Sequence, residues 1–179
     1  MGDRSSTHWV FAYGSNLNLQ DLGHWLTTHG YDPAGIQTLE PACLDDYQLV
    51  WDYRSPVRQG GAANVAPSPG QQVYGGLLRV DSSCLDGLDH KEGHPERYNR
   101  GTELVACRPL SDPKSEIYAW VYEVQPAFKQ SEFTAPRRAY RDIVVAGAQS
   151  LGLPGSWIEH LRSTPTLDSN NPNGSTIAF

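Results

Sequence analysis

The sequence is poor in cysteine, and its cysteines lie far apart. Cys43, Cys84 and Cys107 are the only three in 179 residues, and no two of them form a CxxC pair. A disulfide-stabilised secreted domain would need more cysteines, and a zinc site would need closer spacing. We therefore expect no disulfide framework and no zinc site, and we expect the protein to lie in the reducing cytoplasm.

Long apolar runs and concentrated positive charge are also absent. No run of about 18 apolar residues occurs, so we expect no membrane span. The opening MGDRSSTHW lacks the apolar stretch of a signal peptide. The formal net charge is −6, and basic residues gather only in short clusters such as residues 137–141. This distribution argues against binding to a nucleic-acid backbone.

The usual motifs for cofactors and covalent nucleophiles are missing as well. The chain has no G-x-S-x-G elbow, no P-loop and no dinucleotide-binding fingerprint. We therefore expect no bound cofactor. If the protein is an enzyme, its substrate has to bring its own nucleophile.

The chain is long enough for one domain with a substantial core, and 39% of its residues are hydrophobic. β-branched and aromatic runs separated by Gly, Pro, Asp and Ser predict strands over residues 8–13, 47–53, 62–66, 73–80, 102–108 and 117–124. Apolar residues at helical spacing predict helices over about 18–27, 82–92, 134–151 and 156–161.

Many strands and few helices indicate an α+β domain, with helices packed on a small mixed or barrel-like sheet. Short strand runs between turns favour antiparallel pairing. We expect a single domain over residues 1–162. The remaining residues, 163–179, form a polar, turn-rich tail that we expect to be a surface arm or disordered. The sequence is compatible with a homodimer as well as with a monomer.

The helix expected over 134–151 carries one continuous apolar stripe that begins at Tyr140. The Tyr140 ring should therefore point inward, with a hydroxyl that needs a hydrogen-bond partner. Thr134 is expected to cap this helix, Pro136 to lie in its first turn, and Gly152 to end it. In the helix over 82–92, Ser83 and Asp86 are expected to form the N-terminal capping pair.

The segment Tyr13-Gly14-Ser15-Asn16 lies between an apolar strand and a polar helix. Such a turn aims free backbone N–H groups outward at the positive end of a helix. A carboxylate or a developing oxyanion would be stabilised there, and Gly14 would let a ligand approach closely. The same pattern also fits a helix cap without further function.

Glu92 shares a helical stripe with Leu85 and Leu88, so the helix should point it inward. Burial and the carbonyl end of the helix both disfavour its charged form. Such a carboxylate can accept and donate a proton near neutral pH, as general acid–base catalysis requires. The alternative is an exposed glutamate at a fraying helix end, or one neutralised by Arg97 or Arg100.

The acidic and histidine residues around Glu92 suggest further roles, which the sequence supports less strongly. Asp89 lies on the same stripe, and we expect it to be structural, bonded to nearby backbone. His90 and His94 flank Glu92, but Gly93 breaks the helix between them, and His-x-Glu-x-His differs from the helical zinc motif. A metal-dependent hydrolase using these two histidines and Glu92 is therefore only a weak alternative.

Four segments in order resemble the gamma-glutamylcyclotransferases: VFAYGSNL, VYGGLLRVD, LDGLDHKEGHPERY and TAPRRAYRDIVVAGAQSLGLP. They span about residues 9–162. The resemblance implies that family's small barrel-like α+β fold. It also implies a C–N-cleaving enzyme, of lyase or acyltransferase type, linked to glutathione metabolism. In its reaction the α-amine of a gamma-glutamyl compound attacks its own γ-carbonyl, which releases 5-oxoproline and a free amine or amino acid.

The same resemblance implies roles for individual residues. Glu92 matches the carboxylate that shuttles the proton. The residues that match the substrate-binding segment and the tyrosines of the pocket are Val10, Phe11, Ala12, Tyr13, Gly14, Ser15, Asn16, Tyr98, Tyr122 and Tyr140. The expected partner is a small gamma-glutamyl substrate, without metal or other cofactor.

The segment GHPERYNR departs from the metazoan dipeptide-cleaving enzymes and resembles microbial relatives. Those relatives include enzymes that trim gamma-glutamyl groups in secondary metabolism, so the leaving group stays open. Asn16 fits the glutathione-specific branch less well. A further alternative, from a different functional class, is a non-catalytic module on the same fold that binds a small carboxylate ligand at residues 14–16.

Overall fold

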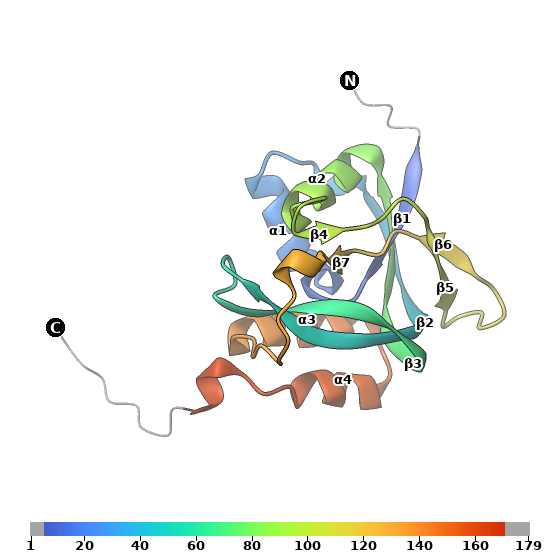
Figure 1. Ribbon diagram of the computed structural model, residues 1–179. Coiled ribbons are helices and arrows are strands. Elements are labelled where there is room, and N and C mark those ends of the chain that lie inside the picture. The colour runs from blue at the N-terminus through green and yellow to red at the C-terminus, as the bar shows by residue number, and fades with distance from the viewer. Residues whose placement is uncertain (1–5, 171–179) are drawn as a thin grey trace.

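A long β-hairpin forms the centre of the molecule (Figure 1). The computed structural model describes residues 6–170. The hairpin consists of β2 (Ile36–Ser55) and β3 (Gly60–Asp81). The other strands are β1 (Thr7–Ala12), β4 (Tyr98–Asn99), β5 (Val105–Pro109), β6 (Ile117–Ala119) and β7 (Glu123–Val124).

The main sheet has five strands in the order β1-β3-β2-β5-β6, and β4 and β7 form a separate pair. Every strand pair is antiparallel. The predicted α+β class and antiparallel pairing are thus confirmed. The sheet is not closed into a barrel, although an isolated parallel bridge between Val10 and Trp120 brings β1 next to the chain that follows β6.

The predicted strands are correct in place but wrong in extent. The three runs predicted over 47–53, 62–66 and 73–80 belong to only two strands, because the polar stretch around Pro67 stays paired with β2. A register shift near Asp46 bends the hairpin there. Asp46 has a positive φ, and its carboxylate accepts a hydrogen bond from the Gly70 N–H at 2.8 Å. The bend curls the hairpin around the core.

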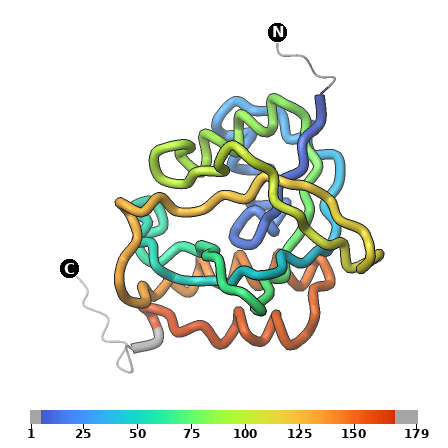
Figure 2. Tube along the Cα trace, turned by 45° about the vertical axis from the view of Figure 1, so that its right-hand side comes forward, coloured from blue at the N-terminus to red at the C-terminus, as the bar shows by residue number. Residues whose placement is uncertain are grey.

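The helices lie on two sides of the hairpin. They are α1 (Leu19–Thr28), α2 (Ser82–Glu92), α3 (Arg138–Leu151) and α4 (Gly155–Arg162). Short 3₁₀ helices are η1 (Ser15–Leu17), η2 (Pro33–Gly35), η3 (Pro126–Phe128) and η4 (Leu167–Asn170). Both views place α1 and α2 on one side of the hairpin and α3 and α4 on the other (Figures 1 and 2).

One predicted helix start and one predicted cap are wrong, while α2 spans its predicted range. α3 begins at Arg138, because residues 134–136 dock in extended form on the hairpin: the Thr134 N–H donates to the Trp51 carbonyl at 2.7 Å. Pro136 therefore precedes the helix, in keeping with the restriction that a proline places on the residue before it. α2 is capped by Asp81, whose carboxylate accepts from the Cys84 N–H, and not by Ser83 with Asp86. Gly152 does end α3, in a left-handed conformation.

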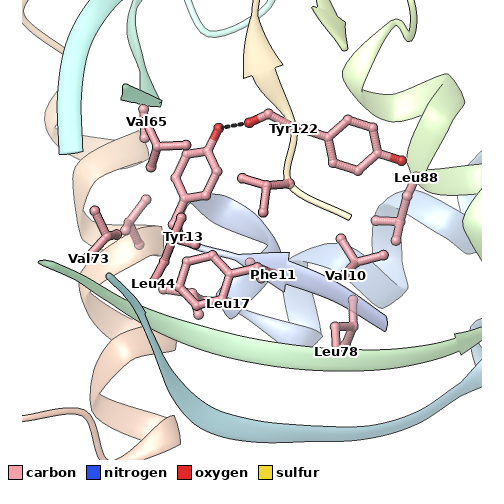
Figure 3. Close-up of a cluster of buried hydrophobic side chains, with 14 of the residues drawn as sticks. Val10, Phe11, Tyr13, Leu17, Leu44, Val65, Val73, Leu78, Leu88 and Tyr122 are labelled. Carbon is pink, nitrogen blue, oxygen red and sulfur yellow. Dashed lines mark hydrogen bonds between the residues drawn. The ribbon is translucent and has the colours of Figure 1, made fainter. Parts of the chain in front are cut away.

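A continuous apolar core fills the space between these elements (Figure 3). Phe11, Leu44 and Leu78 are among its fully buried side chains. All three cysteines are free and buried, and burial raises the pKa of the Cys43 and Cys107 thiols to about 12. Within residues 6–170, none of the helices combines the length and apolar character needed to cross a bilayer.

Part of the tail predicted over 163–179 is described. The Leu167 N–H donates to the Pro136 carbonyl at 2.9 Å, and Asp168 accepts from the Arg138 N–H at 3.0 Å. Residues 163–170 therefore lie against the start of α3. The rest of the predicted tail, residues 171–179, lies outside the described residues.

Candidate active site

The turn after β1 forms one wall of the site. β1 ends at Ala12, η1 follows at Ser15, and Asn18 caps α1 by accepting the Asp21 N–H at 3.1 Å. The side chains of Ser15 and Asn16 are buried in this wall. Gly14 is placed where a Cβ would lie 3.3 Å from the Tyr140 hydroxyl oxygen. The predicted strand–turn–helix order is correct, with a 3₁₀ turn inserted before α1.

Glu92 lies at the end of α2, directly beside this turn. Leu85 and Leu88 turn the same face of α2 into the core, so Glu92 follows them inward, and its side chain is 17% exposed. Gly93 then ends the helix in a left-handed conformation. The Asn16 Nδ2 donates to Glu92 Oε1 at 2.9 Å. Glu92 and Asn16, which are 76 residues apart in the sequence, thus meet at this hydrogen bond.

Lys91, which was not among the predicted site residues, links the same two segments. Its Nζ donates to Asn16 Oδ1 at 2.7 Å and to Ser15 Oγ at 3.1 Å, and it lies 3.9 Å from Glu92 Oε1. The Lys91 side chain is 6% exposed, and burial is the main cause that lowers its pKa. Because Asn16 accepts from Lys91 with its oxygen, its NH₂ group must face Glu92.

Asp89 has a structural environment of its own. Arg100 donates to both of its carboxylate oxygens, at 2.9 and 3.1 Å, and the Tyr122 hydroxyl donates to Oδ1 at 2.5 Å. The expected structural role is consistent with these contacts, but its partners are side chains and not backbone. Arg100 is therefore engaged by Asp89, and the cation next to Glu92 is Lys91.

Four tyrosines surround the site, and three of them donate their hydroxyl hydrogens to the protein. Tyr13 donates to the Tyr122 carbonyl at 2.5 Å (Figure 3), Tyr98 to the Ala63 carbonyl at 2.8 Å, and Tyr122 to Asp89. These bonds explain why the rings are buried and fixed. Their hydroxyl hydrogens are therefore unavailable to a ligand.

Tyr140 differs from the other three. Its ring is buried against Trp51, as its place on the α3 stripe predicts, and its hydroxyl oxygen accepts from the Ala63 N–H at 3.3 Å. Within residues 6–170 no acceptor takes the hydrogen of this hydroxyl. Burial raises the pKa of Tyr140 to about 12, so the hydroxyl keeps its hydrogen at neutral pH.

These groups line a small cavity that opens to solvent, with about 330 Å³ of space when its open mouth is included. It is lined by Phe11, Ala12, Tyr13, Gly14, Ser15, Asn16, Ala63, Glu92, Tyr98, Tyr122 and Tyr140. The structure therefore brings together every predicted site residue except Val10, which is buried beside Leu78 in the β1–β3 ladder. Ala63 was not predicted, because nothing in the sequence pairs its strand with this turn.

A larger outer cleft of about 1,220 Å³, part of it open to solvent, adjoins the inner cavity. The two share Ser15, Glu92, Tyr98 and Tyr140. Arg58, from the turn between β2 and β3, lies at this junction: it donates to Ser15 Oγ at 3.4 Å, and its guanidinium lies 5.0 Å from the centre of the Tyr140 ring. Arg58 was not among the predicted site residues either.

The histidines beside Glu92 have other neighbours. His90 is exposed and packs edge-on against Trp25 and Tyr31, while His94 packs against the Tyr122 ring. Among residues 6–170 no group of three or more His, Cys, Asp or Glu side chains is arranged to hold a metal ion. The two histidines and Glu92 thus do not converge on one point.

Known proteins are similar to this chain in both sequence and fold. It is 27% identical to the mouse protein named gamma-glutamylcyclotransferase over 168 aligned residues. The alignment covers 90% of this chain and 81% of the mouse protein. The human protein of the same name is 27% identical over 172 residues, covering 93% of this chain and 84% of the human protein.

Solved structures of related proteins have a similar fold. One titled gamma-glutamyl cyclotransferase has a TM-score of 0.74 at 24% identity, covering 97% of this chain and 94% of that one. A yeast cyclotransferase described as specific to glutathione has a TM-score of 0.57 at 12% identity, covering 88% and 94%. The model of the family described as gamma-glutamyl cyclotransferase, AIG2-like, matches residues 10–142, and the chain belongs to this family.

Proposed function

We propose that this protein is a gamma-glutamyl cyclotransferase that releases 5-oxoproline from a gamma-glutamyl amine or amino acid. The observation that carries the proposal is the position of Glu92: a mostly buried carboxylate that accepts from Asn16 at 2.9 Å, on the wall of a cavity formed by residues 11–16. Family membership supports the same reaction. The cavity suits a small polar acyl group, and the outer cleft leaves room for the group attached to it.

The reaction balances without a cofactor. Glu92 accepts a proton from the α-ammonium of the substrate, and the freed amine attacks the γ-carbonyl carbon. A C–N bond forms within the gamma-glutamyl unit while the C–N bond to the leaving amine breaks. Glu92 returns its proton to the leaving nitrogen. The second proton, which the attacking nitrogen loses as the lactam forms, ends on the released amine, which leaves as an ammonium ion. The substrate supplies the nucleophile, which accounts for the missing nucleophile motifs.

The γ-carbonyl oxygen gains negative charge during the attack and needs a donor. Tyr140 is the hydroxyl that can serve, because Tyr13, Tyr98 and Tyr122 donate to protein acceptors. Its oxygen is held by the Ala63 N–H, which orients the phenol. A preorganised donor of this kind stabilises the transition state more than the ground state.

Replacing Tyr140 by phenylalanine should therefore lower kcat by about 100-fold, since one donor to the oxyanion is lost. Tyr118→Phe is the matched control, because Tyr118 is 55% exposed and lies outside the cavity. The wild-type rate should show no loss from ionisation of Tyr140 up to about pH 10, because its pKa lies near 12. Equal turnover in the Phe variant would assign Tyr140 to packing alone.

The function itself is tested by incubating the purified protein with a panel of gamma-glutamyl amino acids, amines and peptides. We expect 5-oxoproline and the free amine in equal amounts, at a rate that a chelator leaves unchanged. A panel that gives no product while 5-oxoproline raises the melting temperature would instead identify a binding module. Product formed only from amines of secondary metabolism would point to a trimming enzyme.

A further inference from the structure

The outer cleft meets the inner cavity at Glu92, and this junction defines where the leaving group goes. If the gamma-glutamyl unit occupies the inner cavity, as the proposed function requires, the scissile nitrogen lies beside Glu92. The group attached to that nitrogen must then extend past Glu92 into the outer cleft. The side chains of the outer cleft therefore decide which leaving groups fit.

The charges of the outer cleft leave one cation without a counter-ion. Arg58 lies 3.5 Å from Asp21, and Lys91 lies 3.9 Å from Glu92, so each of these cations faces a carboxylate. Arg97 also lines the cleft, and among the described residues its guanidinium has no ion pair or hydrogen bond. The protein as a whole carries a net charge of −6. An unpaired arginine in this setting is suited to bind a carboxylate.

Arg97 lies against the backbone that directly follows Glu92. Its guanidinium lies over Gly93, where a Cβ would come within 2.2 Å of Arg97 Nε. Gly93 directly follows Glu92 and has a positive φ of 67°. Both the conformation and the close approach favour glycine at this position. The α-carboxylate of an amino acid bonded through its nitrogen would lie one carbon away from that nitrogen, near this guanidinium.

Aromatic rings from the end of α1 and from α2 line one part of the cleft. Trp25 and His29 stack with their ring centres 3.8 Å apart, and His90 meets Trp25 edge-on at 5.3 Å. Val57, at the hairpin turn, is 76% exposed and lines the same cleft. A partly exposed ring stack that shares its cleft with an exposed aliphatic side chain favours a flat apolar group.

We propose that the outer cleft is a leaving-group subsite selective for an aromatic amino acid, with its carboxylate on Arg97 and its ring against Trp25 and His29. This inference rests on the proposed function and narrows it to one class of leaving group. The carboxylate and the ring are recognised by different residues, so each contribution can be measured separately.

Four substrates separate the two contributions: gamma-glutamyl-phenylalanine, gamma-glutamyl-alanine, gamma-glutamyl-phenethylamide and gamma-glutamyl-ethylamide. They combine the presence or absence of a ring with the presence or absence of a carboxylate. We expect kcat/KM for 5-oxoproline release to be about tenfold higher with the carboxylate than without it, because a charge-assisted hydrogen bond is gained. The ring should add about fivefold.

Two variants assign these preferences. Arg97→Gln should reduce the carboxylate preference to about twofold or less and keep the ring preference. Trp25→Leu should do the opposite. Arg54→Gln is the control, because Arg54 is exposed and lies outside the cleft. Ratios between substrates are measured within one preparation, so a partly unfolded variant does not distort them.

The outcomes are distinct. Wild-type ratios near one, or ratios that survive in Arg97→Gln and Trp25→Leu, would overturn the subsite while 5-oxoproline release still supported the cyclotransferase. Release from none of the four substrates would overturn the subsite, and release from no member of the wider panel of gamma-glutamyl compounds would overturn the proposed function as well. Preferences that disappear separately in the two variants would support both.

Discussion

Glu92→Gln should lower kcat by about 1,000-fold, the largest effect of any single change in this site. Glutamine has the same size as glutamate, and its amide oxygen can still accept the hydrogen bond from Asn16 Nδ2. It cannot take a proton from an ammonium group or return one to the leaving nitrogen. The loss should therefore appear in kcat at saturating substrate, measured as release of 5-oxoproline.

The control for this change is Glu96→Gln, which removes the same charge from an exposed position four residues further along the chain. It should leave turnover unchanged. The melting temperature of Glu92→Gln should stay near that of the wild type, because no core contact is lost. Full activity in Glu92→Gln would remove Glu92 from the chemistry, however close it lies to the turn.

Local sequence patterns predicted the elements of the fold better than their extent. The apolar strand over 8–13 and the stripes of α2 and α3 were found because their periodicity is local. The length of β2 and β3 was not, because polar residues near Pro67 remain in the sheet only through their partners across the hairpin. Thr134 likewise has a good capping side chain, yet its backbone is held by Trp51.

In the candidate site, too, local patterns predicted single residues but not the contacts between distant segments. The stripe through Leu85 and Leu88 predicts that Glu92 faces inward, and the structure leaves its side chain only 17% exposed. No periodicity predicts that it meets Asn16. Lys91 carried one weak signal, since its neighbours one helical turn back, Gly87 and Leu88, are both buried. Arg58 carried none, because a turn at the tip of a hairpin reaches the site only through the bend of β2 and β3.

The last prediction concerns that buried lysine. Lys91→Met should lower kcat/KM by about tenfold or more, because the site loses a buried charge and a hydrogen-bond donor together. The Lys91 ammonium lies 3.9 Å from Glu92 Oε1. Without it, Asn16 loses the donor at 2.7 Å that fixes its orientation toward Glu92.

Stability separates this role from a purely structural one. Burial lowers the pKa of Lys91, which means that the fold disfavours its charged form, and methionine fills similar space without a charge to desolvate. The melting temperature of Lys91→Met should therefore stay level or rise while activity falls. Lys114→Met, at an exposed site, controls for the loss of one positive charge. If activity and melting temperature fall together, Lys91 only supports the fold. If activity falls while the melting temperature is kept, Lys91 acts in the site.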